Sequence, residues 1–226
     1  MKNHYTENVD KHHLSRGADR IDSSGYRSRM KLGVIAFFCL LSIVGTLATS
    51  FLASALHAPI FLDTIFTVAI TFYAGLIPGL IVAVLHNPIM TFIRFVIYGT
   101  DLFYFGSLYA VCGMLIALST WIFSRNKKDF FFNRTVTVLY LLIIVFVSSF
   151  LSCFSASALD TFIRPLLNDS LRFFPIDIFS IPFQKLKFGM FLSYLLPRIP
   201  ITVLDRLICT FSGFGLYRLV ERRISC

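Results

Sequence analysis

Long apolar runs without a charged side chain divide this chain. Four of them have 22 to 30 residues free of Asp, Glu, Lys and Arg: Gly33–Leu56, Thr64–Ile93, Leu102–Phe123 and Thr135–Leu159. About 20 apolar residues in a helix are enough to cross the hydrocarbon core of a bilayer. The pattern therefore predicts an all-α integral membrane protein.

The second run, Thr64–Ile93, is too long for one upright crossing. Its 30 residues would rise about 45 Å as a helix, whereas the hydrocarbon core is about 30 Å thick. The segment Gly75–Gly79, with Pro78, lies at its middle, and Gly and Pro together are typical of a tight turn. We expect two helices, at about residues 60–76 and 78–98. One bent helix is the alternative, and it would give five crossings instead of six.

Six transmembrane helices follow if the turn is correct. The other four are predicted at about residues 33–56, 102–123, 135–159 and 199–220. The last of these is the weakest, because Asp205 and Arg206 interrupt it. Residues 160–190 are expected to form an outer loop, which an amphipathic interfacial helix would also fit. The six helices would make one membrane domain, residues 33–223, after a basic and disordered tail at residues 1–32.

Basic residues predict the orientation. The net charge is +9, and Lys and Arg concentrate in the tail, in Arg125–Arg134 and in Arg218–Arg223. Positive residues in membrane proteins gather on the cytoplasmic side, and six crossings place all three clusters there. We therefore expect both termini to be cytoplasmic in a multi-pass protein of the cell's inner (cytoplasmic) membrane. Because the basic excess reports topology, no nucleic-acid partner is expected.

Composition agrees with this fold class. The chain is 56% hydrophobic and its mean hydropathy is +0.75, which would leave a soluble domain with a mostly apolar surface. The function must then lie in the few polar groups that remain inside the bundle. A charge within the hydrocarbon costs several kcal/mol unless it is paired or faces water.

Charged residues at the outer halves of several helices are candidates for a polar pocket. Asp63 opens a helix whose polar residues Thr64, Thr67 and Thr71 share one face, and Asp205 with Arg206 interrupts the last helix. We expect these charges to be buried in the bundle. A structural ion pair between Asp63 and either Arg206 or Arg94 is the alternative.

Three further residues near the ends of the outer segments are open to two interpretations. Asp160, Arg164 and Arg198 could converge on the pocket, or they could mark helix ends and reach toward the lipid headgroups. The sequence does not favour either interpretation.

The segment His86-Asn87-Pro88 lies near the middle of the membrane in the third helix. Proline frees a backbone carbonyl, and the two polar side chains can satisfy it or face a cavity. A packed, hydrogen-bonded histidine without a binding role is the alternative.

A stripe of small residues follows the first helix at Gly45, Thr49 and Ala53. Small residues four apart allow two helices to approach closely. We expect a docking surface there, either for a neighbouring helix of the same chain or for a partner protein.

Several chemistries have no motif in this sequence. The phosphate-binding Gly-rich loop, the His-Glu-x-x-His pair and the Gly-x-Ser-x-Gly elbow do not occur, and the cysteines have no paired metal-ligand spacing. We therefore expect no catalytic residue, metal site or cofactor, and an intramembrane enzyme ranks third among the function classes.

Three segments resemble the S components of energy-coupling-factor (ECF) transporters. Leu62–Ile65 matches the start of a helix in that family, with Phe66 in place of a glycine, and Ala74–Asn87 matches its Gly-Pro turn and Gly/Ala-rich helix. Pro200–Ile208 matches the opening of the last helix, with Arg206 in place of a lysine.

The resemblance implies a membrane subunit that captures a vitamin or another micronutrient from outside. A transmembrane coupling protein and two ATPase subunits would be its partners, and the small-residue stripe would be the nearest equivalent of the family's docking motif. The residues expected to bind the substrate are Asp63, Thr67, His86, Asn87, Arg94, Asp205 and Arg206. A membrane domain that senses a ligand or serves as a scaffold, without transport, is the alternative function.

Overall fold

The computed structural model describes residues 33, 36–37, 39–49, 51–52, 62–98, 105–167, 175–187 and 189–224. The chain divides into two compact units, Met1–Phe38 and Cys39–Cys226. In the first unit the described residues are helical, and the predicted tail at residues 1–32 lies outside the described part. The second unit contains everything discussed below.

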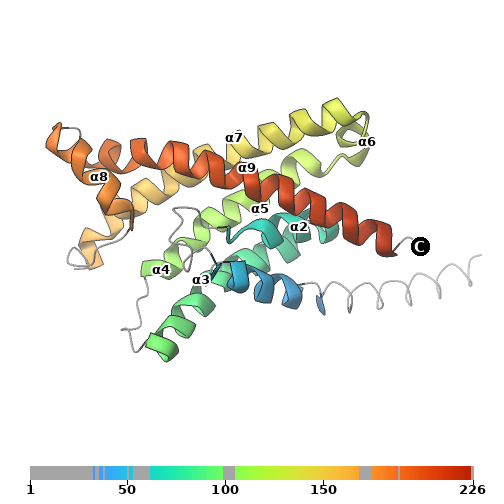
Figure 1. The fold of residues 1–226 in the computed structure, drawn as a ribbon, viewed down its shortest axis with the longest axis horizontal. Coiled ribbons are helices and arrows are strands. Elements are labelled where there is room, and N and C mark those ends of the chain that lie inside the picture. Colours follow the sequence, from blue (N-terminus) through green and yellow to red (C-terminus); the bar gives the residue numbers. More distant parts are fainter. Residues whose placement is uncertain are drawn as a thin grey trace, which may run out of the picture. The chain divides into compact units, whose positions relative to one another are not determined.

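The described part of the second unit is helical and contains no strand, as the sequence predicts (Figure 1). A helix at Cys39–Thr49 comes first. It is followed by α2 (Ile65–Ala74), α3 (Leu76–Tyr98), α4 (Phe105–Leu108), α5 (Ala110–Ser124), α6 (Lys127–Phe130) and α7 (Arg134–Ala158). A π-helix, η1 (Leu159–Ile163), continues α7, and η2 (Pro165–Leu167), α8 (Pro175–Lys185) and α9 (Met190–Ile224) complete the order.

Four of these helical segments are long and apolar enough to cross a membrane: Leu76–Ile93, Gly106–Ser124, Arg134–Ile163 and Met190–Arg223. The protein is therefore a multi-pass membrane protein. The apolar helices Cys39–Thr49 and Ile65–Ala74 are shorter. Six crossings remain a prediction.

Gly75 separates α2 from α3, so the Thr64–Ile93 run forms two helices and not one bent helix. Its φ of 94° lies in the region that glycine tolerates best, and its N–H donates to the Thr71 carbonyl at 3.0 Å. A Cβ atom added at Gly79 would collide with the Thr71 hydroxyl. The two helices therefore pack closely beside the turn.

The last helix is longer than predicted. It begins at Met190, not near residue 199, and it contains Pro197 and Pro200. Residues 160–190 likewise include η1, η2 and α8 where a loop was expected, although α8 agrees with the alternative of a helix in this segment. Proline is tolerated within membrane helices because neighbouring groups satisfy the carbonyls that it frees. The consequence is that Arg198 lies on a helix inside the bundle.

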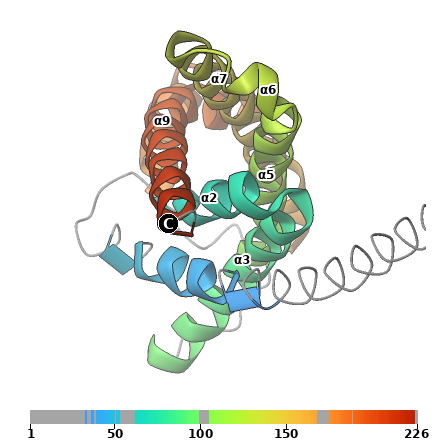
Figure 2. The same ribbon diagram turned by 90° about the vertical axis from the view of Figure 1, so that its right-hand side faces the viewer.

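Short α2 lies among the long helices. It contacts α3, α5 and α9, while α7 contacts both α5 and α9 (Figure 2). Glycine residues allow these helices to pack closely. A Cβ atom at Gly213 of α9 would lie 2.7 Å from the Ile65 carbonyl oxygen of α2. A Cβ atom at Gly113 of α5 would lie 3.2 Å from the Ala83 Cβ atom of α3.

Aromatic side chains fill one end of the unit. Phe72 of α2 stacks on Tyr217 of α9 with ring centroids 5.7 Å apart, and it lies 5.6 Å from Phe130 of α6. The Lys127 ammonium lies 5.4 Å from the Tyr217 ring centroid, and the Arg218 guanidinium lies 5.2 Å from that of Phe131. Two of the three basic clusters in the sequence therefore lie at the same end.

Candidate functional site

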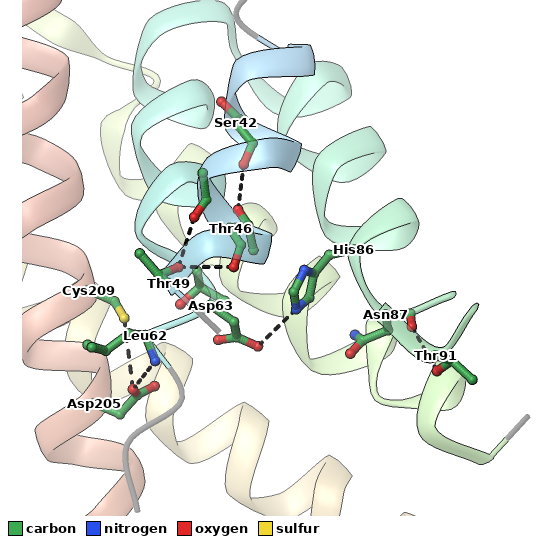
Figure 3. A network of polar contacts seen from close by, with 12 residues as sticks. Ser42, Thr46, Thr49, Leu62, Asp63, His86, Asn87, Thr91, Asp205 and Cys209 are labelled. Atoms are coloured by element: carbon green, nitrogen blue, oxygen red, sulfur yellow. Dashed lines mark hydrogen bonds and ion pairs between the residues drawn. The ribbon is translucent and has the colours of Figure 1, made fainter. Parts of the chain in front are cut away.

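A charged pair on α9 holds the beginning of α2. The Leu62 N–H donates to Asp205 Oδ1 at 3.0 Å (Figure 3), and Leu62 has a φ of 49°, a costly conformation for a branched side chain. Asp205 is 0% exposed and pairs with Arg206 at 3.4 Å between Oδ2 and Nη2. Arg206 in turn donates to the Thr64 hydroxyl. Both charges therefore have a structural use.

Asp63 and His86 face each other between α2 and α3 (Figure 3). The His86 Nε2 lies 3.8 Å from Asp63 Oδ2. The Asp63 side chain keeps 24% of its surface accessible, yet its Oδ1 atom is buried without a hydrogen-bond partner in the described part of the chain. Asp63 thus keeps an acceptor atom without a hydrogen bond among the described residues.

The polar face of α2 points into the protein, as predicted. Thr64, Thr67 and Thr71 are all buried, and the Thr71 hydroxyl donates to the Thr67 carbonyl at 2.6 Å. Thr67 lies one turn after Asp63, so it borders the charged group.

The remaining predicted binding residues are placed differently. Asn87 is half-buried, and its backbone carbonyl accepts a bond from the Thr91 hydroxyl at 2.9 Å. Arg94 belongs to α3, but its side chain lies outside the described residues. Binding by these two residues stays a prediction.

The small-residue stripe is used in part within the chain. A Cβ atom at Gly45 would collide with the ring of Phe66 in α2, so a neighbouring helix of the same chain occupies this position. The Thr49 hydroxyl donates back to the carbonyls of Gly45 and Thr46 at 3.1 and 3.0 Å. Ala53 lies outside the described residues, and docking of a partner protein stays a prediction.

A second buried charged group contains a residue that the sequence analysis missed. The Tyr109 hydroxyl, just before α5, donates to Asp160 Oδ1 at 2.6 Å. Arg198 of α9 pairs with the other carboxylate oxygen, and its guanidinium lies 5.9 Å from the Tyr109 ring centroid. Asp160 is 1% exposed, so it does not reach toward the headgroups.

The backbone is irregular on both sides of this ion pair. Asp160 lies in the π-helix η1, and such π segments are frequent at functional positions. Arg198 lies between Pro197 and Pro200. Arg164, directly after η1, is also buried. Asp160 and Arg164 therefore lie at a helix end, as one interpretation expected, but they do not reach outward. Arg198 is half-buried within α9.

The two charged groups are neighbours. Cys112 of α5 interacts electrostatically with Arg206, Arg198 and Asp63, and its thiol donates to the Ser152 carbonyl of α7 at 3.7 Å. Thr202 lies one helical turn from each arginine and is buried. These long-range electrostatic interactions place both groups in the same polar region of the interior, between α2, α5, α7 and α9.

Many polar atoms of this interior have no protein partner. Within the described part of the chain they include Asp63 Oδ1, Arg198 Nη1, Arg206 Nε and the hydroxyls of Ser149, Ser152, Ser157, Thr161 and Thr210. A buried polar atom without a hydrogen bond costs about 1–3 kcal/mol, so native proteins contain few of them. Ordered water or a bound polar molecule would satisfy these atoms. The described residues contain no group of three or more side chains suited to a metal ion.

Comparison with known protein families, with curated proteins and with solved structures finds no match to this chain.

Proposed function

We propose that this protein is the substrate-binding membrane subunit of an ATP-driven uptake system, of the kind that the S-component resemblance implies. It captures a small polar molecule at Asp63, His86 and Arg206. The observation that supports this most is the convergence of charged side chains from α2, α3 and α9 inside a membrane protein, with polar atoms left over for a ligand.

A purely structural network would use all of its polar atoms. Asp205 is committed to the Leu62 N–H and to Arg206. Arg206 keeps an unpartnered Nε, however, and Asp63 keeps an unpartnered Oδ1. A buried charge costs several kcal/mol unless it is fully compensated, and a bound polar molecule supplies the missing hydrogen bonds.

The position of the group along α9 fits capture from the outer side. Arg206 precedes the basic residue Arg222 by 16 residues, a helix rise of about 24 Å. If the basic end is cytoplasmic, as proposed, Arg206 lies in the outer half of the bilayer. The coupling protein and the two ATPase subunits would then act from the inner side.

The apolar outer face of the Cys39–Thr49 helix could serve lipid contact or the coupling protein. Leu40, Leu41 and Val44 are exposed on it.

The direct test is to purify the full chain in detergent and to identify the co-purifying small molecule by mass spectrometry. We expect Asp63→Asn and Arg206→Gln each to weaken its binding about 10- to 100-fold, because each removes a charge-assisted contact. Arg218→Gln is the matched control, since Arg218 pairs with Glu221 at the exposed basic end and should leave ligand retention unchanged.

Unchanged ligand retention in both site variants would refute the proposal for these residues. The variants must stay inserted and monodisperse, so size-exclusion profiles accompany each measurement.

A further inference from the structure

The second charged group gives the proposed site a chemical preference. We propose that the ligand is an elongated organic cation: its positive group pairs with Asp63, and neutral oxygen atoms farther along accept hydrogen bonds from Arg206 and Arg198. This inference rests on the proposed function and names the class of its substrate.

The charge pairing argues for a cation. Asp205 pairs with Arg206 and Asp160 pairs with Arg198. Among the described residues, the imidazole of His86 is the group within ion-pair distance of Asp63, 3.8 Å away, and Arg206 acts on Asp63 from farther away. A ligand with one positive charge would complete the pairing with Asp63. A ligand carboxylate would instead add a negative charge beside two arginines that already have carboxylate partners, and excess charge is expensive in this environment.

The unpartnered donors argue for neutral oxygen atoms on the same ligand. Arg206 Nε and Arg198 Nη1 are both buried without an acceptor. A carbonyl or hydroxyl oxygen satisfies such a donor without adding charge. Arg164 is not one of these donors, because it has an interaction of its own.

The spacing argues for an elongated molecule. Arg198 and Arg206 are eight residues apart on α9, which corresponds to about 12 Å of helix rise. Cys112 interacts electrostatically with both arginines and with Asp63, so the two groups are close enough for one molecule to reach both. A ligand that reaches from Asp63 to Arg198 must therefore carry its oxygen well away from its positive group.

The test uses isothermal titration calorimetry of the purified full chain with four matched series of graded length. ω-Amino amides carry a cation and a neutral oxygen, N-acetylated ω-amino amides are neutral, ω-amino acids are zwitterions, and alkylamines lack the oxygen. We expect the ω-amino amides to bind best, with an optimum among the longer members. Their neutral and zwitterionic counterparts should bind about 10- to 100-fold more weakly.

Two variants test which protein group contacts each end of the ligand. Asp63→Asn should remove the preference for the amide cation over its neutral N-acetyl counterpart. The charge-balanced double variant Asp160→Asn/Arg198→Gln should make long ω-amino amides and alkylamines bind equally, while the preference for a cation remains. Each result is a change in preference between ligands, which a general loss of stability would not produce.

Equal binding of the neutral or zwitterionic series, or no measurable binding of any series, would overturn the cation assignment. The proposed function would survive that result if a co-purified molecule of another charge still depended on Asp63 and Arg206. If neither dependence is found, both proposals fail together.

Discussion

Single residues with little or no side chain decide how closely the helices approach. Gly213 brings α9 against the first turn of α2, about two helical turns after the charged pair that holds Leu62. A larger side chain there would push the helices apart and disturb the contact of Arg206 with Thr64. The geometry of the proposed site therefore depends on a residue that carries no functional group.

We expect Gly213→Ala to lower the unfolding free energy by about 1–3 kcal/mol through overpacking. The added Cβ atom would lie 2.7 Å from the Ile65 carbonyl oxygen and 2.9 Å from Val68 Cβ. Thermal unfolding in detergent measures the effect. Gly215→Ala is the control on the same helix, because its Cβ atom would meet nothing within 4 Å; it should leave the melting temperature unchanged or slightly higher. Equal melting temperatures for both variants would contradict the close approach.

Individual buried charges could be predicted from the sequence, but the residues with which they form ion pairs and hydrogen bonds could not. Asp63, Asp205 and Arg206 could be singled out because a charge next to long apolar runs is visible in one dimension. The contact of Asp160 with Tyr109 and Arg198 joins residues 51 and 38 positions away. Such pairing is decided by how three helices pack, and Tyr109 has no local signal that distinguishes it from other aromatic residues.

Among the elements, α6 is a short connector that is fixed by one large side chain. It has four residues, too few for a stable helix on its own. Phe130 is 1% exposed and packs against Phe72, Tyr140 and Phe214. This contact ties the link between α5 and α7 to α2 and α9.

Phe130→Ala should destabilise the protein by about 3–5 kcal/mol, since it removes a fully buried aromatic side chain and leaves a cavity. Chemical unfolding in detergent, followed by the fluorescence of the single tryptophan, provides the measurement. Phe132→Ala is the matched control because Phe132 is 82% exposed, and its unfolding curve should overlay that of the unchanged protein. A small effect at Phe130 would show that α6 is held by other contacts.

Element boundaries followed from the sequence where local chemistry decides them. Gly75 ends α2 because it adopts a positive φ that other residues avoid, so the turn could be predicted. The beginning of α9 could not, because Pro197 and Pro200 read as helix breakers. The hydrogen bonds that these prolines remove from the helix are compensated by neighbouring groups inside the bundle. This packing cannot be predicted from a single sequence.

At the scale of the whole membrane unit, basic residues from two of the three clusters in the sequence lie at one end. The aromatic end carries Lys127, Arg125 and Arg218. The other end contains the turn at Leu186 and Lys187 that joins α8 to α9. The positive-inside tendency predicts that the aromatic end is cytoplasmic.

This orientation is testable by cysteine accessibility. In a variant without native cysteines, we expect Lys128→Cys and Arg222→Cys to react with a membrane-impermeant maleimide only in inverted vesicles, and Lys187→Cys only in intact cells. Lys187 is exposed at the opposite end of α9 from Arg222. If Lys128→Cys and Lys187→Cys were labelled from the same side of the membrane, the topology would be contradicted. If all three variants were labelled from the side opposite to the one expected, the orientation would be inverted.

The shortness of α2 has a consequence for permeation. Its 10 residues rise about 15 Å, half of the hydrocarbon thickness. Under the proposed function and orientation, a solute docked at the Asp63 end would have left bulk water, and about half of the hydrocarbon thickness would separate it from the far compartment. The remaining passage would then run along one short helix.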